Sequence, residues 1–274
     1  MFKIPARDRV WEIDTPQIMG IMNATQDSFF EASRVEFVDT AVKKAGTFIT
    51  NGASIIDIGG QSTRPGAQFI SAQEEIQNIV PIIESIHAKY PSVLLSVDTF
   101  QSKVAEAALQ AGAHIVNDIS CGAFDKEILK VVTSHNAGYI GMHLTGDKNT
   151  MHQVPTRTHI VTEVIQYFEQ KKKDLSLQGI ENWVLDPGFG FGKTIQENFE
   201  LVKSLKQFST LALPILLGVS RKSSIYKTLG IDANEALNGT TVVNTVGLLN
   251  GANILRVHDV NEAQQIIKLL SYLA

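Results

Sequence analysis

The chain alternates between two kinds of segment along most of its length. Short apolar runs are each followed by a longer stretch in which apolar residues recur every three or four positions. The short runs predict β-strands, and the longer stretches predict amphipathic α-helices. The expected strands are residues 18–22, 55–58, 94–97, 115–116, 139–142, 183–185, 215–217 and 254–257. The expected helices are residues 37–49, 74–89, 102–111, 126–134, 160–175, 195–205, 235–249 and 260–273.

Eight strand–helix units follow one another without a domain-scale linker or a low-complexity segment. Short apolar strands that alternate with helices are typical of a parallel sheet covered by helices. Eight units within 274 residues favour a single α/β domain over residues 1–274, folded as a (β/α)8 TIM barrel. A doubly wound open sheet is the alternative, although it commonly has fewer strands. Residues 1–16 are expected to form a short leader, with a small hairpin around Trp11 and Asp14.

The stretch from 183 to 194, W-V-L-D-P-G-F-G-F-G-K-T, is the clearest candidate for a ligand-binding turn. A short strand ends at Asp186, and Pro187 stops it because proline removes a backbone donor. Alternating glycines then let the backbone turn and approach a ligand closely. Pro187 stands where a Walker A loop needs glycine, and Lys193 stands where the dinucleotide-binding fingerprint needs one. The alternative to a binding site is a tight turn with a solvated aspartate.

Polar residues gather where the expected strands end. They are Asn23, Asp57, Asp98, Asn117, His143, Asp186, Lys222 and Arg256. In a barrel these ends converge on one mouth, where the chemistry of such folds occurs. A single residue of this kind could be a helix cap, as Asn23 could, but eight caps at one mouth are hard to explain.

Composition narrows the possible functions. Hydrophobic residues make up 44% of the chain and charged residues 19%, which is enough for a substantial core. The net charge of −4 gives no case for a nucleic acid or an anionic membrane as partner. No apolar run approaches the length of a bilayer span. The single cysteine, Cys121, precludes an intrachain disulfide and fits a reducing cytoplasm.

The expected mouth offers carboxylates, side-chain amides, a lysine, an arginine and two histidines. This set fits a planar heterocycle, because carboxylates accept from ring N–H groups and arginine stacks on ring faces. A zinc centre at His143 and His258 is an alternative, but no His-x-x-x-His or paired cysteines support it. A redox dinucleotide would need the fingerprint that residues 183–194 lack.

Eight stretches also carry a family resemblance. They are M-G-I-M-N-A-T-Q-D-S-F, I-I-D-I-G-G-Q-S-T-R-P-G-A, S-V-D-T-F, A-G-A-H-I-V-N-D-I, M-H-L-T-G, L-D-P-G-F-G-F-G-K, G-V-S-R-K-S and I-L-R-V-H-D-V. With them the chain resembles the dihydropteroate synthases, folate-pathway enzymes of the pterin-binding barrel superfamily. The stretches follow that family's order from about residue 19 to residue 260 and touch every expected strand.

The resemblance implies a transferase. In its reaction p-aminobenzoate attacks the CH2 group of 6-hydroxymethyl-7,8-dihydropterin diphosphate, by an SN1-like path, and gives 7,8-dihydropteroate and pyrophosphate. The implied catalytic residues are Asp98, Asp186, Lys222 and Arg256. The implied pterin-binding residues are Asp98, Asn117, Met142, Asp186, Lys222 and Arg256. The implied diphosphate-binding residues are Asn23, Arg256 and His258, with Mg²⁺ bound near Asn23. The implied p-aminobenzoate pocket consists of Thr63, Arg64, Pro65, Phe191 and Ser223.

The resemblance also implies a homodimer that associates through its last helices and is a sulfonamide target. The chain departs from the family in two loops. Gln26 stands where proline is usual, Glu31-Ala32-Ser33 where Asp-Gly-Gly is usual, and Gln61 where glutamate is usual. The first loop, residues 24–34, is expected to be mobile when the site is empty. It retains Asp27 and Phe29, which are expected to close over the reacting CH2 group and exclude water.

Two other functions remain open. One is a methyltetrahydrofolate-dependent methyltransferase of the same superfamily, although S-T-R-P-G together with S-R-K-S favours the synthase and no cobalamin module adjoins. The other is a catalytically weak pterin-binding protein whose first loop has decayed. Turnover of the dihydropterin diphosphate with p-aminobenzoate would separate the three.

Overall fold

The fold was obtained as a computed structural model, which describes residues 1–24, 31–62 and 66–273. Eight parallel strands form one sheet in the order β8-β7-β6-β5-β4-β3-β10-β9. They are β3 (Gln17–Asn23), β4 (Ile55–Gly59), β5 (Leu94–Asp98), β6 (Ile115–Asp118), β7 (Gly138–Met142), β8 (Val184–Asp186), β9 (Leu216–Leu217) and β10 (Ile254–Val257). A parallel bridge between Leu185 and Ile215 joins the two ends of the sheet. The predicted TIM barrel is therefore confirmed, and the open sheet is excluded.

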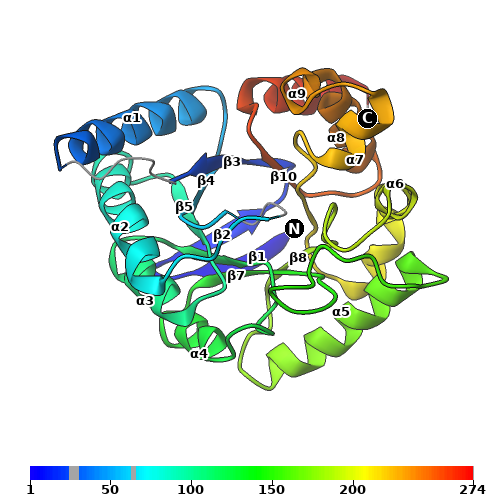
Figure 1. The fold of residues 1–274 in the computed structure, drawn as a ribbon, viewed down its shortest axis with the longest axis horizontal. Coiled ribbons are helices and arrows are strands. Elements are labelled where there is room, and N and C mark those ends of the chain that lie inside the picture. Colours follow the sequence, from blue (N-terminus) through cyan, green and yellow to red (C-terminus); the bar gives the residue numbers. More distant parts are fainter. Residues whose placement is uncertain (25–30, 63–65, 274) are drawn as a thin grey trace.

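Helices surround the barrel, as Figure 1 shows. They are α1 (Glu31–Thr50), α2 (Ala72–Lys89), α3 (Ser102–Gln110), α4 (Glu127–Ser134), α5 (Ile160–Ser176), α6 (Ile195–Lys203), α7 (Ser223–Leu229), α8 (Leu237–Leu249) and α9 (Val260–Leu273), with 3-10 helices η1 (Leu205–Leu211) and η2 (Ala233–Glu235). Helix α2 shows why they form, because Ser71 caps its start by accepting from the backbone N–H of Glu74. Its buried residues Ile79, Ile82, Ile83 and Ile86 recur at helical spacing and face the sheet.

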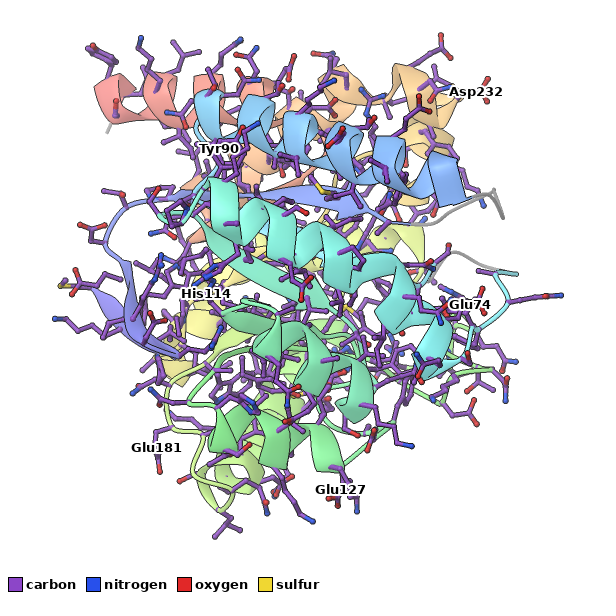
Figure 2. All side chains as sticks on the ribbon, turned by 90° about the vertical axis from the view of Figure 1, so that its left-hand side faces the viewer. Glu74, Tyr90, His114, Glu127, Glu181 and Asp232 are labelled. Carbon is purple, nitrogen blue, oxygen red and sulfur yellow. The ribbon has the colours of Figure 1, made fainter. Side chains whose placement is uncertain are left out.

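The N-terminal hairpin is part of the barrel and not a detached leader. Strands β1 (Phe2–Ala6) and β2 (Arg9–Ile13) pair antiparallel, which confirms the hairpin expected around Trp11. Their buried side chains join the apolar floor of the barrel. This floor consists of Ile4, Ala6, Trp11, Ile13, Met19, Ile55, Ile115, Ile140, Val184, Leu216 and Ile254. In Figure 2 the hairpin lies at the end marked by Tyr90, the residue that follows α2, whereas Glu74, in the first turn of α2, lies at the opposite end.

Several predicted boundaries are wrong. Helix α1 begins at Glu31 and not at residue 37, so residues 31–34 belong to a helix and not to the first loop. Alanine and glutamate favour a helix where glycines would end one, which explains the extension. Helix α6 stops at Lys203, and residues 205–211 form a 3-10 helix. In the part of the chain that the structure describes, none of the helices has the length and hydropathy needed to span a bilayer.

Candidate active site

The polar residues expected at the mouth come from adjacent strands of the barrel. In the sheet register Asp98 of β5 pairs with Asn117 of β6, and Met142 of β7 pairs with Asp186 of β8. Asn23 ends β3 and is exposed. The parallel sheet thus brings these strand ends to one side of the barrel, as the pattern of the chain predicts.

A salt-bridged arginine lies among these strand ends. Arg256 of β10 donates from Nε to Asp57 Oδ2 at 2.6 Å and from Nη2 to Asp98 Oδ2 at 2.5 Å. Asn117 Nδ2 donates to the same Asp57 oxygen at 3.0 Å. Asp57 is fully buried, so its charge depends on these donors. The network fixes the guanidinium and leaves Arg256 Nη1 without a hydrogen bond to any residue that the structure describes.

The carboxylate of Asp186 begins the glycine loop of residues 188–192. It is 7% exposed, and its Oδ1 accepts from the backbone N–H of Gly188 at 2.7 Å. Gly188 has a φ of +74°, and a β-carbon there would collide with the carbonyl oxygen of His143. Glycine is therefore required for this turn. Burial raises the pKa of Asp186, while Lys222 and the Gly188 N–H oppose the shift.

Two lysine side chains donate hydrogen bonds to the backbone of this loop. Lys222 donates from Nζ to the carbonyl oxygen of Phe189 at 2.5 Å, and its Nζ lies 4.9 Å from the centroid of the Phe191 ring. Lys193, buried at 8% exposure, donates to the carbonyl oxygens of Gly188 and Phe191. Because both cations bond to backbone oxygens, they hold the loop while facing the carboxylates of the mouth.

One acidic and one basic side chain at the mouth have pKa values that are shifted toward neutral pH. Burial raises the pKa of Asp98 to about 7, opposed by Arg256 and assisted by Asp57. Burial lowers the pKa of Lys222 to about 8, although Asp186 opposes that shift. Perturbed pairs of this kind are typical of functional sites, where groups must bind a charged ligand or exchange protons.

His258 follows β10 and bonds to Ser220. Its Nδ1 lies 2.9 Å from Ser220 Oγ, which also accepts from the His258 backbone N–H at 3.2 Å. When the Ser220 hydroxyl donates to Nδ1, the proton of the neutral ring lies on Nε2, so the direction of this bond depends on the tautomer of the ring. Burial lowers the pKa of His258 to about 4, assisted by Arg256. His258 is therefore a neutral imidazole at neutral pH.

His143 does not join the mouth. Its ring packs against Tyr167 at 4.8 Å and Phe168 at 6.5 Å between centroids, both on α5. Burial lowers its pKa to about 2. Among the described residues, no three histidine, cysteine or acidic side chains are grouped so that they could hold a metal ion. The structure thus gives no support to zinc at His143 and His258, because His143 is a packing residue behind the glycine loop.

An apolar wall stands beside the charged groups. Met142 is buried against Phe100, Ile119 and Met151, and Phe191 packs on this cluster. Lys148 places its ammonium 4.5 Å from the centroid of Phe100. A wall of this kind beside a hydrogen-bonding edge is the usual composition of a pocket for a flat ligand.

Some predicted site residues lie outside the described part of the chain. These are Thr63, Arg64 and Pro65 of the second loop, and Asp27 and Phe29 of the first. The expected mobility of the first loop falls there too. Ser223 is described and is the first residue of α7.

The departure at Gln61 has a structural reason. Its Oε1 accepts from the backbone N–H of Ile70 at 2.8 Å. Its Nε2 donates to the carbonyl oxygens of Ser62 at 2.7 Å and Gln68 at 3.1 Å. A glutamate could make the first bond but neither of the others, because a carboxylate has no donor. The second loop of this chain is therefore closed by an amide.

Comparison with known proteins defines the class to which this site belongs. Residues 19–258 match the model of the pterin binding enzyme family. The chain therefore belongs to the family of pterin-binding enzymes.

Two relatives at high coverage are dihydropteroate synthases. The chain is 41% identical over 255 residues to the dihydropteroate synthase of Synechocystis sp. (strain ATCC 27184 / PCC 6803 / Kazusa), covering 92% of this chain and 88% of the relative. It is 36% identical over 270 residues to that of Escherichia coli (strain K12), covering 98% and 95%.

Solved structures of dihydropteroate synthases have the same fold as this chain. The dihydropteroate synthase of Xanthomonas albilineans with 4-aminobenzoic acid has a TM-score of 0.90 and 32% identity, covering 99% of this chain and 97% of that chain. The dihydropteroate synthase of Yersinia pestis in a sulfonamide drug complex has a TM-score of 0.91 and 33% identity, covering 99% of both chains. The resemblance seen in the sequence is confirmed.

Sequence reasoning missed two residues of the site. Asp57 was recognised at a strand end but was not assigned to the site, although it bonds Arg256 across 199 positions of the chain. A pairing over such a distance has no local signal in the sequence. From the sequence alone, Lys193 is named only as the residue that excludes the dinucleotide-binding fingerprint. Its position directly after a glycine loop was the signal that could have identified it.

Proposed function

We propose that this transferase condenses 6-hydroxymethyl-7,8-dihydropterin diphosphate with p-aminobenzoate to form 7,8-dihydropteroate and pyrophosphate. The observation that carries the proposal is the ion-pair network in which Arg256 binds Asp98 and the buried Asp57, beside Asn117 and Asp186. These groups supply acceptors, donors and a planar cation at the end of a barrel where ligands bind. The kinship with dihydropteroate synthases supports the same reaction.

In this proposal the pterin lies between the strand ends. Asp98 and Asp186 accept from ring N–H groups, Asn117 both donates and accepts, and Lys222 donates. Met142, at the end of β7, packs against the ring, and Arg256 stacks on it. The bonds from Arg256 to Asp57 and Asp98 hold its guanidinium plane in one orientation before the substrate arrives.

The chemical step breaks the C–O bond between CH2 and the diphosphate, and the electron pair leaves with pyrophosphate. The carboxylates of Asp98 and Asp186 favour the positive charge left on the conjugated CH2 group. The amine of p-aminobenzoate then forms the new C–N bond and loses a proton. Because this amine is a weak nucleophile, an SN1-like path suits it, provided that water is excluded. Asp27 and Phe29 of the first loop are proposed for that exclusion.

Asn23, Arg256 and His258 are proposed to hold the diphosphate. Arg256 has Nη1 available for this, and His258 offers an Nε2–H in the tautomer in which Ser220 donates to Nδ1. The exposed amide oxygen of Asn23 suits Mg²⁺, which is typically bound by one or two protein oxygens together with substrate phosphates and water. When bound, Mg²⁺ would neutralise charge on the leaving group. Added Mg²⁺ should therefore raise turnover, and equal turnover with chelator would contradict its role.

The second substrate is proposed to bind beside the glycine loop. Phe191 packs beside the Met142 cluster, and Ser223 lies at the start of α7, next to Lys222. Thr63, Arg64 and Pro65 of the second loop complete the proposed pocket. The Yersinia pestis relative is known with a sulfonamide drug. A sulfonamide should therefore compete with p-aminobenzoate, and a purely noncompetitive effect would contradict a shared pocket.

Turnover tests the proposed function directly. The purified protein should form dihydropteroate and release one pyrophosphate for each product when both substrates and Mg²⁺ are supplied. Pterin binding without turnover would indicate the catalytically weak paralogue. Methyl transfer from a methyltetrahydrofolate would indicate the other branch of the superfamily.

A homodimer through the last helices is also proposed. Val242, Val246 and Leu249 are exposed along one face of α8. Leu269, Tyr272 and Leu273 are exposed on α9, which packs beside α8 in Figure 1. Exposed apolar patches of this kind mark association surfaces. Sedimentation should give a dimer, and Val242→Lys should shift it toward monomer; a wild-type monomer would exclude the interface.

A cytoplasmic location is proposed on separate grounds. The single cysteine, Cys121, is buried, and burial raises the pKa of its thiol to about 12. Because a single cysteine cannot form an intrachain disulfide, an oxidising compartment would not stabilise this fold. Cell fractionation would test this, and recovery outside the cytoplasm would contradict it.

A further inference from the structure

One buried cation of the glycine loop has no part in the function proposed above. Lys193 donates from Nζ to the carbonyl oxygens of Gly188 at 2.8 Å and Phe191 at 3.0 Å. Only 8% of the residue is exposed. A lysine at this depth costs free energy unless its charge is paired or hydrogen-bonded, so the two carbonyls are its compensation.

Two further side chains form hydrogen bonds with the backbone of the glycine loop. Lys222 donates to the carbonyl of Phe189, which lies between the two carbonyls that Lys193 binds. The N–H of Gly190 donates to Asn198 Oδ1 at 2.7 Å. Asn198 lies on α6, so that helix also anchors the loop. The carbonyls turn inward toward ammonium groups, which leaves the Phe191 ring against the apolar wall of the mouth.

We infer that Lys193 is a positioning residue for both substrates. Its bond to Gly188 fixes the turn whose N–H orients the Asp186 carboxylate. Its bond to Phe191 fixes the ring that borders the proposed p-aminobenzoate pocket. One side chain therefore couples the pterin half of the mouth to the other half. The inference rests on the proposed function, because it takes the roles of Asp186 and Phe191 from there.

The surroundings of Lys193 make its charge sensitive to pH. The charged and titratable groups that face it are Asp186 on β8, Lys222 before α7, Glu197 on α6, Arg157 before α5 and His143 after β7. Burial lowers the pKa of Lys193 to about 7, while Asp186 acts in the opposite direction. The ammonium is present below that pH and is lost above it. An arginine at this position would stay charged throughout.

Three variants separate positioning from packing. Lys193→Met keeps the unbranched chain but removes both donors and the charge, whereas Lys193→Arg keeps the charge. Lys203→Met is the matched control, because Lys203 is an exposed lysine on the helix that follows the loop. The measurements are the Kd of 6-hydroxymethylpterin by calorimetry, the KM for p-aminobenzoate by turnover, and thermal unfolding of each variant.

Lys193→Met should raise the Kd and the KM by about tenfold each, since two carbonyls lose a charged donor. Lys203→Met should change neither. Wild-type pterin affinity should begin to fall near pH 7, whereas in Lys193→Arg the fall should begin about one pH unit later, when Lys222 titrates with its pKa of about 8.

A folded Lys193→Met that leaves either constant within about twofold of wild type would overturn the inference. If Lys193→Met does not fold, Lys193→Arg decides, and an unshifted pH profile would overturn it. The proposed function fails separately, if the wild-type protein binds 6-hydroxymethylpterin but forms no dihydropteroate, because the comparison of Kd values can still be made.

Discussion

The two ends of the barrel are built from the same eight strands but from opposite kinds of residue. At the N-terminal end, Ile4 and Trp11 of the hairpin pack on inward-facing aliphatic residues such as Ile115. At the C-terminal end, the half-buried Arg256 forms an ion pair with the fully buried Asp57. Apolar burial stabilises the fold, whereas buried charges are costly unless they are bonded. The comparison indicates that one end provides stability and the other provides chemistry.

The N-terminal end should show the largest effect on stability. Trp11→Ala should lower the free energy of unfolding by about 3–5 kcal/mol, because it removes a fully buried indole and leaves a cavity. The indole N–H bond to Gln17 Oε1 at 2.7 Å is lost as well. Denaturant unfolding measures this loss, while pterin affinity measured under native conditions should stay near wild type.

Val10→Ala is the control for that change. Val10 lies next to Trp11 on the same strand but is 59% exposed. Its truncation should alter unfolding by no more than about 0.5 kcal/mol. If Trp11→Ala instead weakened pterin binding and left unfolding unchanged, the division between the two ends would be wrong.

At the C-terminal end, Asp186→Asn should affect binding most. The change keeps the size of the side chain but removes a charged acceptor and adds donors that face the ring's own N–H groups. The loss should be about 2–4 kcal/mol of pterin binding. Calorimetry with 6-hydroxymethylpterin measures it. An affinity within a factor of about two of wild type would remove Asp186 from the site.

The acid side of the pH profile should report Asp98. Its pKa is raised by burial to about 7, so below that pH the empty site holds a neutral carboxyl that accepts poorly. Pterin affinity should therefore fall as pH drops below about 7, by at most about 1.4 kcal/mol per pH unit. The other charged groups that face Asp98 are Arg256, Asp57, Glu75, Asp118 and Lys222. Asp98→Asn should bind weakly but without this slope, and a flat wild-type profile would speak against the assignment.

The smallest effect is expected in the second loop. Gln61→Glu should raise the KM for p-aminobenzoate only a few-fold, about 1 kcal/mol, because two neutral hydrogen bonds are lost at the loop's base. Pterin affinity should not change. Gln68→Glu, the same chemical change on an exposed side chain of that loop, is the control. Equal effects of the two variants would show that charge, and not the amide bonds, matters.

Much of the fold could be predicted because the spacing of apolar residues and the ends of the strands are local properties of the sequence. The helix over residues 260–273 was predicted with its observed bounds, since its apolar spacing is regular. The start of α1 at Glu31 is missed because the apolar spacing that predicts this helix begins only at Phe37, although Glu31 and Ala32 favour a helix.

The sequence predicts which residues lie at the strand ends of the site, but it does not predict the hydrogen bonds and ion pairs between them. Position along the chain indicates that Asp98 and Arg256 share a mouth. It does not indicate that Arg256 bonds Asp57 and Asp98 together, or that His258 is neutral, because burial and long-range pairing determine these. The same applies to Lys193, whose two carbonyl partners depend on the loop conformation.

A crystal structure of the protein with 6-hydroxymethylpterin tests the central claim most directly. We expect the ring at the C-terminal mouth, with its N–H groups facing the carboxylates of Asp98 and Asp186 and one face toward Arg256. Lys222 and Asn117 should complete the hydrogen bonds at its edge. A pterin bound elsewhere, or at the mouth without a contact to either carboxylate, would contradict the account.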